Sequence, residues 1–237
     1  MQRRSSPASL PLREAADVSR ERKVLFIGNS FTNRNDLPGT FTRIAGSAVP
    51  PRRFATRSII ANGMALKTHW NRGLAREAMR GEAWDFVVLQ EQSTLPLKNR
   101  ARMHESICLF DEEIRRHGAR TVLYMTWARR SALDRQDELS DAYESISRQL
   151  GALVAPVGRA WQRAMAADPE LVLHDKDGSH PNAIGTYLAA CVFVAVLAGL
   201  NPVGLTSDLP ALENHMPTDV RALEKAAWQA VRSENLA

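Results

Sequence analysis

The sequence has few cysteines and no long hydrophobic run. Only two of its 237 residues are cysteines, Cys108 and Cys191, and both fall within predicted helices. A thiol inside a helix usually behaves as a small apolar side chain, so neither a disulfide framework nor a metal site is indicated. No stretch has the length of a membrane span, and residues 1–22 lack the apolar centre of a signal peptide. We therefore expect a cytoplasmic protein with no membrane partner.

The chain also has little excess charge outside its amino terminus. Its formal net charge is +5, and residues 1–23 hold six basic groups against three acidic ones. A basic stretch without interleaved aromatic residues is more typical of a solvated tail than of a nucleic-acid-binding surface, so no nucleic-acid partner is expected. We predict a flexible basic tail over residues 1–22 and a single domain over residues 23–237, and we leave the oligomeric state open.

Apolar runs alternate with helical segments along the whole domain, which is typical of a parallel sheet between two layers of helices. The chain is 44% hydrophobic, enough for one sizeable core. The predicted strands are 23–28, 54–60, 84–90, 120–126 and 153–155. The predicted helices begin near residue 36 and continue with 66–80, 100–117, 136–150, 159–167, 181–200 and 218–231. The fold class predicted is α/β, a three-layer α/β/α sandwich with a five-stranded parallel sheet.

A serine, a histidine and an aspartate stand where hydrolytic chemistry could use them. Ser30 comes two residues after Gly28, which ends the first apolar run. If that run is a strand, Ser30 lies at the carboxyl edge of the sheet, where parallel sheets place their sites. Asp177 and His180 share a short turn, so the carboxylate can orient the imidazole while its other nitrogen activates a serine. The alternatives are an ordinary strand-to-helix turn at Ser30 and a surface turn at residues 177–180.

Two further segments could stabilise the oxyanion that forms when a serine attacks an ester. Gly63, just after the second strand, can present its backbone N–H. Gln90 at the end of the third predicted strand, or Gln92 two residues later, can present a side-chain carboxamide. The occurrence of all these elements in one chain favours the hydrolytic interpretation over separate structural roles.

The order of these motifs resembles that of the SGNH (GDSL-like) hydrolases. The resemblance spans about residues 23–200 and rests on Gly28-Asn29-Ser30, Gly63 and Asp177-x-x-His180. The third block departs from the family pattern. The chain has Gln-Glu-Gln where the family has Gly-x-Asn, which is similar to the Gln-Gly-Glu of acetyl esterases that act on carbohydrates. The chain also resembles an uncharacterised bacterial subgroup of the superfamily with glutamine in place of this asparagine.

The resemblance implies a flavodoxin-like strand order and a serine esterase. The substrate would be a small-molecule or carbohydrate ester with a small acyl group such as acetyl, and no metal or cofactor would be required. Ser30, His180 and Asp177 would form the triad. The oxyanion hole would combine the backbone N–H groups of Ser30 and Gly63 with the side chain of Gln90, Gln92 being the second choice.

Substrate contacts are expected after the fourth strand. Trp127 and Arg129 lie there, and an indole face suits a sugar ring while a guanidinium suits a carboxylate or phosphate. Gln92 is a third candidate for substrate binding. A buried tryptophan beside a solvated arginine is the structural alternative. Two rival functions remain, an acyltransferase using the same site and a catalytically idle carbohydrate-binding module of the same fold.

Overall fold

The computed structural model of the chain describes residues 20–205, 209, 212–213 and 216–234. Its centre is a five-stranded sheet in which every neighbouring pair is parallel, in the order β2-β1-β3-β4-β5. This is the flavodoxin-like order, and the predicted α/β fold class is confirmed. The strands are β1 (Arg22–Gly28), β2 (Phe54–Ile60), β3 (Phe86–Leu89), β4 (Arg120–Tyr124) and β5 (Leu153–Ala155).

The central strands are apolar throughout because both faces of the sheet are covered. In β1, Val24 and Phe26 pack into one hydrophobic core, whereas Leu25 and Ile27 pack into a second core on the opposite face. This alternation follows from the two-residue period of a strand. All four side chains are fully buried.

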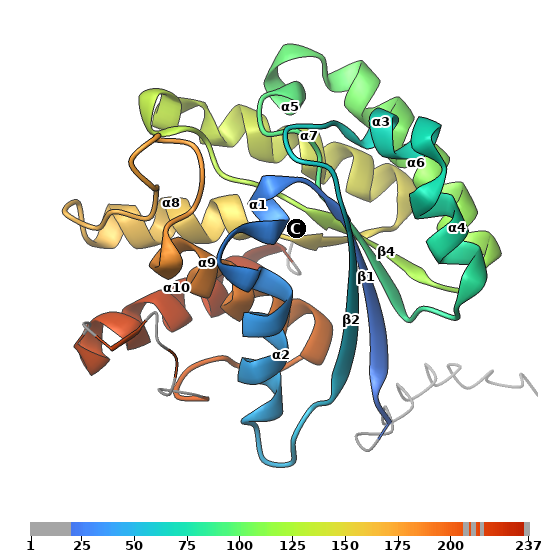
Figure 1. The fold of residues 1–237 in the computed structure, drawn as a ribbon. Coiled ribbons are helices and arrows are strands. Elements are labelled where there is room, and N and C mark those ends of the chain that lie inside the picture. Colours follow the sequence, from blue (N-terminus) through green and yellow to red (C-terminus); the bar gives the residue numbers. More distant parts are fainter. Residues whose placement is uncertain (1–19, 206–208, 210–211, 214–215, 235–237) are drawn as a thin grey trace, which may run out of the picture.

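Helices form the two outer layers, and the sheet runs between them in Figure 1. One layer consists of α2 (Leu37–Gly46), α8 (Val157–Ala167), α9 (Ala183–Phe193) and α10 (Pro217–Glu234). The other consists of α3 (Leu66–Arg72), α4 (Leu74–Gly81), α6 (Arg100–Arg116) and α7 (Gln136–Leu150). Shorter helical segments are α1 (Ser30–Asn33), η1 (Arg34–Asp36), α5 (Leu95–Lys98), η2 (Arg130–Arg135) and η3 (Val194–Ala198).

Two predicted helices differ from the observed ones. The helix expected over 66–80 is divided at Gly73, which has φ +82° and ends α3 in the left-handed region. The helix expected from Pro181 begins at Ala183 instead, because the Asn182 side chain caps it by accepting a hydrogen bond from the Gly185 N–H. After Phe193 it continues as the π-helical segment η3.

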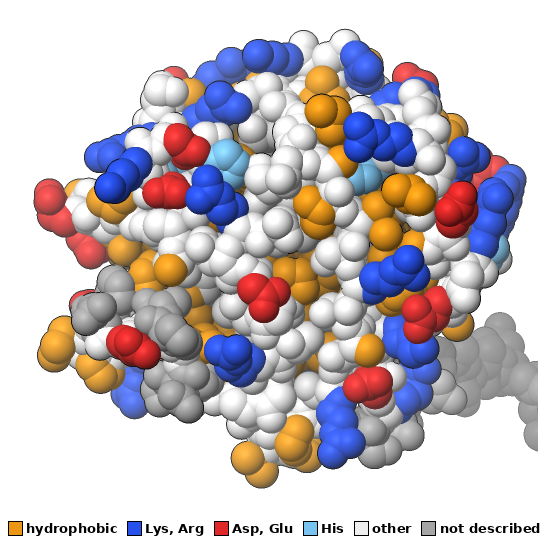
Figure 2. Space-filling view, viewed as in Figure 1, with side chains coloured by type: hydrophobic (Ala, Val, Ile, Leu, Met, Phe, Trp, Pro, Cys, Tyr) orange, Lys and Arg blue, Asp and Glu red, His pale blue; other side chains and the backbone are white. Residues whose placement is uncertain are grey.

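The predicted boundary between tail and domain falls inside β1. Arg22 already pairs with Phe54 of β2, and Arg20 forms an ion pair with Asp85. Residues 1–19, which make up most of the predicted tail, lie outside the described residues. On the face shown in Figure 2, acidic and basic side chains are interspersed. No helix in the described part of the chain is long and apolar enough to cross a membrane.

Parallel strands all end at the same edge of the sheet, and this geometry gathers the predicted site residues. Ser30 follows β1, Gly63 follows β2, Gln90 follows β3 and Trp127 follows β4. Figure 1 shows α1 at this end of β1. The carboxyl edge is therefore where the candidate site is assembled.

Candidate active site

Ser30 opens α1 directly after a tight turn. The Asn29 side chain caps the helix by accepting a hydrogen bond from the Phe31 N–H at 3.1 Å. Gly28 is needed because a Cβ there would lie 2.6 Å from both Gln90 Oε1 and Thr32 Oγ1. The chain can thus turn sharply at the end of β1 and leave the Ser30 side chain partly exposed.

His180 and Asp177 lie beside Ser30, although 150 residues separate Ser30 from His180 in sequence. Ser30 Oγ is 2.8 Å from His180 Nε2, and His180 Nδ1 is 2.5 Å from Asp177 Oδ2. The other oxygen of Asp177 accepts the backbone N–H groups of Ser179 and His180, both at 2.9 Å. Gly178 allows this turn to close with φ +66°. The three side chains form one continuous hydrogen-bonded relay.

The same hydrogen bonds keep Asp177 ionised. Its bond to the His180 ring is the largest cause, and the backbone N–H groups of His180 and Ser179 add to it. Together they hold the pKa of Asp177 far below its usual range. Asp177 is therefore a carboxylate at neutral pH and can stabilise a positive charge on the imidazole.

Asp175 also carries a carboxylate close to His180 in sequence, but it faces elsewhere. One of its oxygens lies 3.1 Å from Arg34 Nη1, and the other accepts the Lys176 backbone N–H. Its backbone N–H, not its side chain, is what contacts His180, by donating to the His180 carbonyl at 2.7 Å. The structure therefore separates Asp177 from Asp175 by orientation.

Gly63 lies in the turn after β2 and is held next to the Ser30 turn. Asn29 Nδ2 donates to the Met64 carbonyl at 3.0 Å, and the Ala61 N–H donates to the Gly28 carbonyl at 3.1 Å. Within the described residues, the backbone N–H groups of Ser30 and Gly63 donate no hydrogen bond. Both are thus unengaged donors on neighbouring turns.

The side chain of Gln90 does not face the site, although the sequence predicts it as an oxyanion donor. Its side chain is completely buried beneath the Ser30 turn. Its oxygen accepts the Asn29 N–H at 2.7 Å and the Thr32 hydroxyl at 3.1 Å, and its nitrogen donates to the Glu91 carbonyl at 2.5 Å. Because both ends of the carboxamide are engaged away from solvent, this side chain is not presented to an oxyanion.

Gln92 is partly exposed, and its oxygen accepts the backbone N–H groups of Thr94 and Leu95 at 2.9 and 3.1 Å. Its amide nitrogen makes no hydrogen bond within the described part of the chain. Of the two glutamines named from the sequence, only Gln92 therefore keeps a donor group that a substrate could reach.

Trp127 is buried, so the prediction that its indole face receives a substrate is wrong. Its side chain stacks between Phe31, with ring centroids 4.8 Å apart, and Trp161, with centroids 4.0 Å apart. Its ring N–H donates to the Ser179 carbonyl at 3.0 Å. Trp127 thus contacts the residue after Ser30 and the residue before His180, and it supports both turns from the core side. Arg129, by contrast, is exposed and reaches Ser93 Oγ at 3.4 Å.

Comparison with solved structures identifies the fold. A candidate SGNH hydrolase from Slackia heliotrinireducens is 27% identical and superposes with a TM-score of 0.64, covering 75% of this chain and 100% of that chain. This chain has the SGNH hydrolase fold. No family model matches the chain, and no curated protein matches it.

Two other proteins share the SGNH hydrolase fold of this chain at lower identity. A DUF4886 family protein from Bacteroides uniformis is 19% identical with a TM-score of 0.68, and the match covers 90% of this chain and 95% of that one. A variant of an acetyl-xylooligosaccharide esterase from Geobacillus is 15% identical with a TM-score of 0.61, covering 74% and 94%. At these identities the likeness concerns the fold.

Asn35 lies next to the candidate site and is not among the residues predicted from the sequence. Its side-chain nitrogen donates to the Pro181 carbonyl at 3.1 Å and to Thr186 Oγ1 at 2.9 Å. It therefore ties the segment after Ser30 to the segment after His180. The only local signal for it is an Asn-Asp pair before a helix; both residues have positive φ, which asparagine and aspartate tolerate better than most residues.

Glu91 is the second residue that was missed. It is completely buried, and its Oε1 accepts the backbone N–H groups of Leu66 at 3.0 Å and Gln92 at 2.6 Å. Burial raises its pKa to about 7, against the smaller opposing effect of these two hydrogen bonds. A glutamate two residues after the end of a wholly apolar strand is the signal that could have found it.

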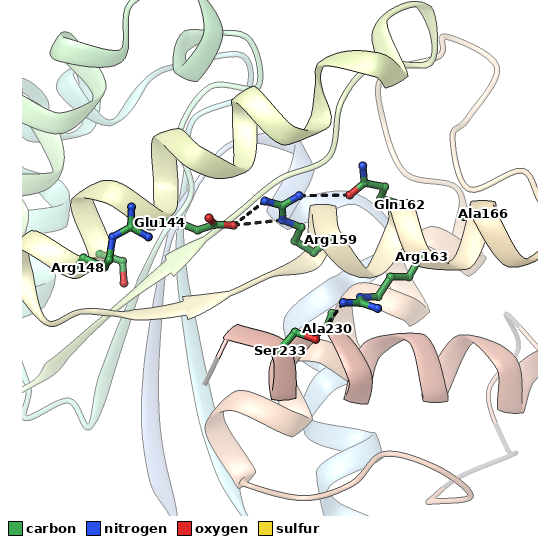
Figure 3. A pocket seen from close by; sticks show the side chains of 9 residues that line it. Glu144, Arg148, Arg159, Gln162, Arg163, Ala166, Ala230 and Ser233 are labelled. Carbon is green, nitrogen blue, oxygen red and sulfur yellow. Dashed lines mark hydrogen bonds and ion pairs between the residues drawn. The ribbon is translucent and has the colours of Figure 1, made fainter. Parts of the chain in front are cut away.

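The described part of the chain also has grooves away from Ser30, His180 and Asp177. Figure 3 shows one of about 610 Å³ between α7, α8 and α10. Two of the three arginines that line it already have partners, since Arg159 pairs with Glu144 at 3.0 Å and Arg163 donates to Ser233 at 3.0 Å. No group of three or more His, Cys, Asp or Glu side chains that could hold a metal ion occurs in the described residues. The hydrogen-bonded Ser30, His180 and Asp177, rather than this groove, mark the candidate site.

Proposed function

We propose that this protein is a serine esterase that hydrolyses esters of small acyl groups. The observation that carries the proposal is the relay from Ser30 Oγ through His180 to Asp177, with separations of 2.8 and 2.5 Å. A serine, a base and a group that orients the base are what covalent acyl transfer needs. The fold of the Slackia protein, itself a candidate SGNH hydrolase, supports the same class of reaction.

The geometry suggests the following course of reaction. Ser30 Oγ attacks the ester carbonyl while His180 Nε2 takes its proton, and Asp177 stabilises the imidazolium. The backbone N–H groups of Ser30 and Gly63 donate to the oxyanion. When the C–O bond breaks, His180 returns the proton to the leaving alcohol and Ser30 stays acylated. Water, deprotonated by His180, then releases the acid and restores the Ser30 hydroxyl.

We further propose an acetyl ester, on a carbohydrate, as the substrate. The support is the likeness to the Geobacillus protein, an acetyl-xylooligosaccharide esterase, combined with the hydrogen-bonded Ser30, His180 and Asp177 in this chain. Arg129 is an exposed side chain at this edge that can contact the substrate, and the amide nitrogen of Gln92 is a second group that the substrate could reach. The burial of Trp127 means that sugar recognition must come from groups other than that indole.

A substrate screen tests this function. Short p-nitrophenyl esters and acetylated sugars should release their acid with wild-type protein, and Ser30→Ala should fold normally but lose on the order of 10³-fold or more in kcat. Equal activity in Ser30→Ala would contradict the proposal. Product analysis with and without added acceptor sugars separates hydrolysis from acyl transfer through the same acyl-enzyme. An idle binding module would bind sugars with no turnover at all.

A further inference from the structure

The two residues that follow β3, Gln90 and Glu91, hold the two turns on which the proposed oxyanion hole depends. Gln90 reaches the turn after β1, where its oxygen accepts the Asn29 N–H at 2.7 Å, one residue before Ser30. Glu91 reaches the segment after β2, where its Oε1 accepts the Leu66 N–H at 3.0 Å, three residues after Gly63. Adjacent side chains therefore connect the end of β3 to the two segments that carry the proposed donors.

Further hydrogen bonds close these contacts into a ring. Gln90 Nε2 donates to the Glu91 carbonyl at 2.5 Å, and Asn29 Nδ2 donates to the Met64 carbonyl at 3.0 Å. The ring thus runs from Gln90 to Asn29, across to Met64, along the chain to Leu66, and back to Glu91. Ser30 directly follows Asn29 and Gly63 directly precedes Met64, so each proposed donor is adjacent to a member of the ring.

The side chains of the ring are buried, so they cannot exchange their hydrogen-bond partners for water. Gln90 and Glu91 have no exposed surface, and Asn29 is 3% exposed. The Gln90 oxygen also accepts the Thr32 hydroxyl, and it fills the space that a Cβ on residue 28 would occupy. A buried, connected polar network fixes one arrangement of the backbone, since any other leaves polar groups unpaired.

We propose that Gln90 and Glu91 are positioning residues that together fix the backbone N–H groups of Ser30 and Gly63 in the geometry required for oxyanion stabilisation. This inference rests on the proposed esterase function. It replaces the role expected for Gln90 from the sequence, because here the carboxamide acts through Asn29 and does not touch the substrate. Oxyanion donors are effective because they are oriented before charge develops, so loosening their support lowers kcat more than it raises KM.

The second oxygen of Glu91 indicates which substitution preserves this role. Oε2 is buried and has no hydrogen-bond partner in the described residues, and burial raises the pKa of this side chain to about 7. Only Oε1 accepts from the Leu66 and Gln92 N–H groups. Glutamine keeps that acceptor oxygen without the charge, whereas leucine keeps the size of the side chain but removes the acceptor.

The test compares Gln90→Leu, Glu91→Leu and Glu91→Gln in ester hydrolysis, with active sites counted by a fluorophosphonate probe. Per titrated site, we expect both leucine variants to lose about 10- to 100-fold in kcat with KM within about twofold, and Glu91→Gln to stay within about threefold of wild type. The double leucine variant should lose less than the product of the single losses because both residues act through one ring. Fully multiplicative losses would overturn the ring.

Thr121→Val is the matched control for loss of a buried hydrogen bond. Thr121 donates to Asp111 at 2.7 Å near the start of β4, at the opposite edge of the sheet. It should lower the melting temperature and leave kcat per site unchanged. If the leucine variants behave in the same way, Gln90 and Glu91 are merely structural and the inference is wrong.

A further variant and the labelling of Ser30 distinguish failure of this inference from failure of the esterase function. Should the leucine variants not fold, Thr32→Val removes one donor to Gln90 and should lower kcat per site by about threefold, whereas no change would overturn the inference. A wild-type chain whose Ser30 is not labelled overturns the esterase function and this inference together. A labelled wild type with unaffected leucine variants overturns the inference alone.

Discussion

At the residue scale, spacing in the sequence predicts that Asp177 is the partner of His180, and orientation in space distinguishes Asp177 from the nearby Asp175. Asp177 lies three residues before His180 and faces its ring, whereas Asp175 faces Arg34. From the sequence alone, either aspartate of this loop could be the partner of His180. The distinction depends on the turn at Gly178, which brings the carboxylate of Asp177 back over the backbone N–H groups of Ser179 and His180.

This orientation predicts unequal effects of two conservative substitutions. Asp177→Asn should lower kcat on the order of 10²- to 10⁴-fold, because an amide neither holds the productive imidazole tautomer nor stabilises its positive charge. Asp175→Asn removes an exposed ion pair, which contributes about 0–1 kcal/mol, and should leave kcat nearly unchanged. Steady-state kinetics on purified, folded variants provides the comparison. Similar losses in both would assign the wrong aspartate to the triad.

For Gln90 and Trp127, the sequence pattern does not predict where the side chain lies. The sequence places Gln90 at the end of a strand, but the two-residue period does not say where the chain leaves the sheet. Because β3 ends at Leu89, the Gln90 side chain turns beneath the Ser30 turn instead of into the site. Trp127 is buried by Phe31 and Trp161, and nothing local in the sequence predicts contacts with such distant partners.

At the element scale, the sequence predicts the type and order of the main elements because their signals are local. Strand β2 and helix α7 lie at the predicted bounds, since an apolar run and a helical period mark them clearly. The break at Gly73 was missed because the helical pattern of apolar residues continues across it. The site itself depends on loops between elements, which have no such period.

Two glycines in different loops allow a direct comparison. Gly178 and Gly118 both have positive φ, at +66° and +75°, so an alanine should cost each about 1 kcal/mol of stability. Only Gly178 lies in the turn that joins Asp177 to His180. We expect similar falls in melting temperature for Gly178→Ala and Gly118→Ala, but a fall in kcat of about 10-fold or more for Gly178→Ala alone. Equal kcat values would mean that the turn does not position His180.

At the scale of the whole molecule, the fold buries an ionisable glutamate at the junction of its site segments. The pKa of Glu91 is raised from 4.5 to about 7 by burial, so the folded protein holds the proton more tightly than the unfolded chain. Stability from this group is fully present below about pH 4.5 and is lost as the pH rises through 7. The loss is roughly 3 kcal/mol for a shift of this size.

The pH dependence of unfolding measures this contribution. The free energy of unfolding of the wild type, minus that of Glu91→Gln, should fall between about pH 4.5 and pH 7 and then level off. Chemical denaturation at a series of pH values gives the difference, and charges common to both proteins cancel. A difference that stays constant over this range would show that Glu91 does not titrate there.

The central claim is that Ser30 is a nucleophile activated by His180 and Asp177. The most direct measurement is the rate at which a fluorophosphonate labels Ser30, with the site of labelling located by mass spectrometry. We predict stoichiometric labelling of Ser30 in the wild type, slowed by on the order of 10²-fold or more in His180→Ala and absent in Ser30→Ala. Labelling at another residue, or an equal rate without His180, would contradict the account.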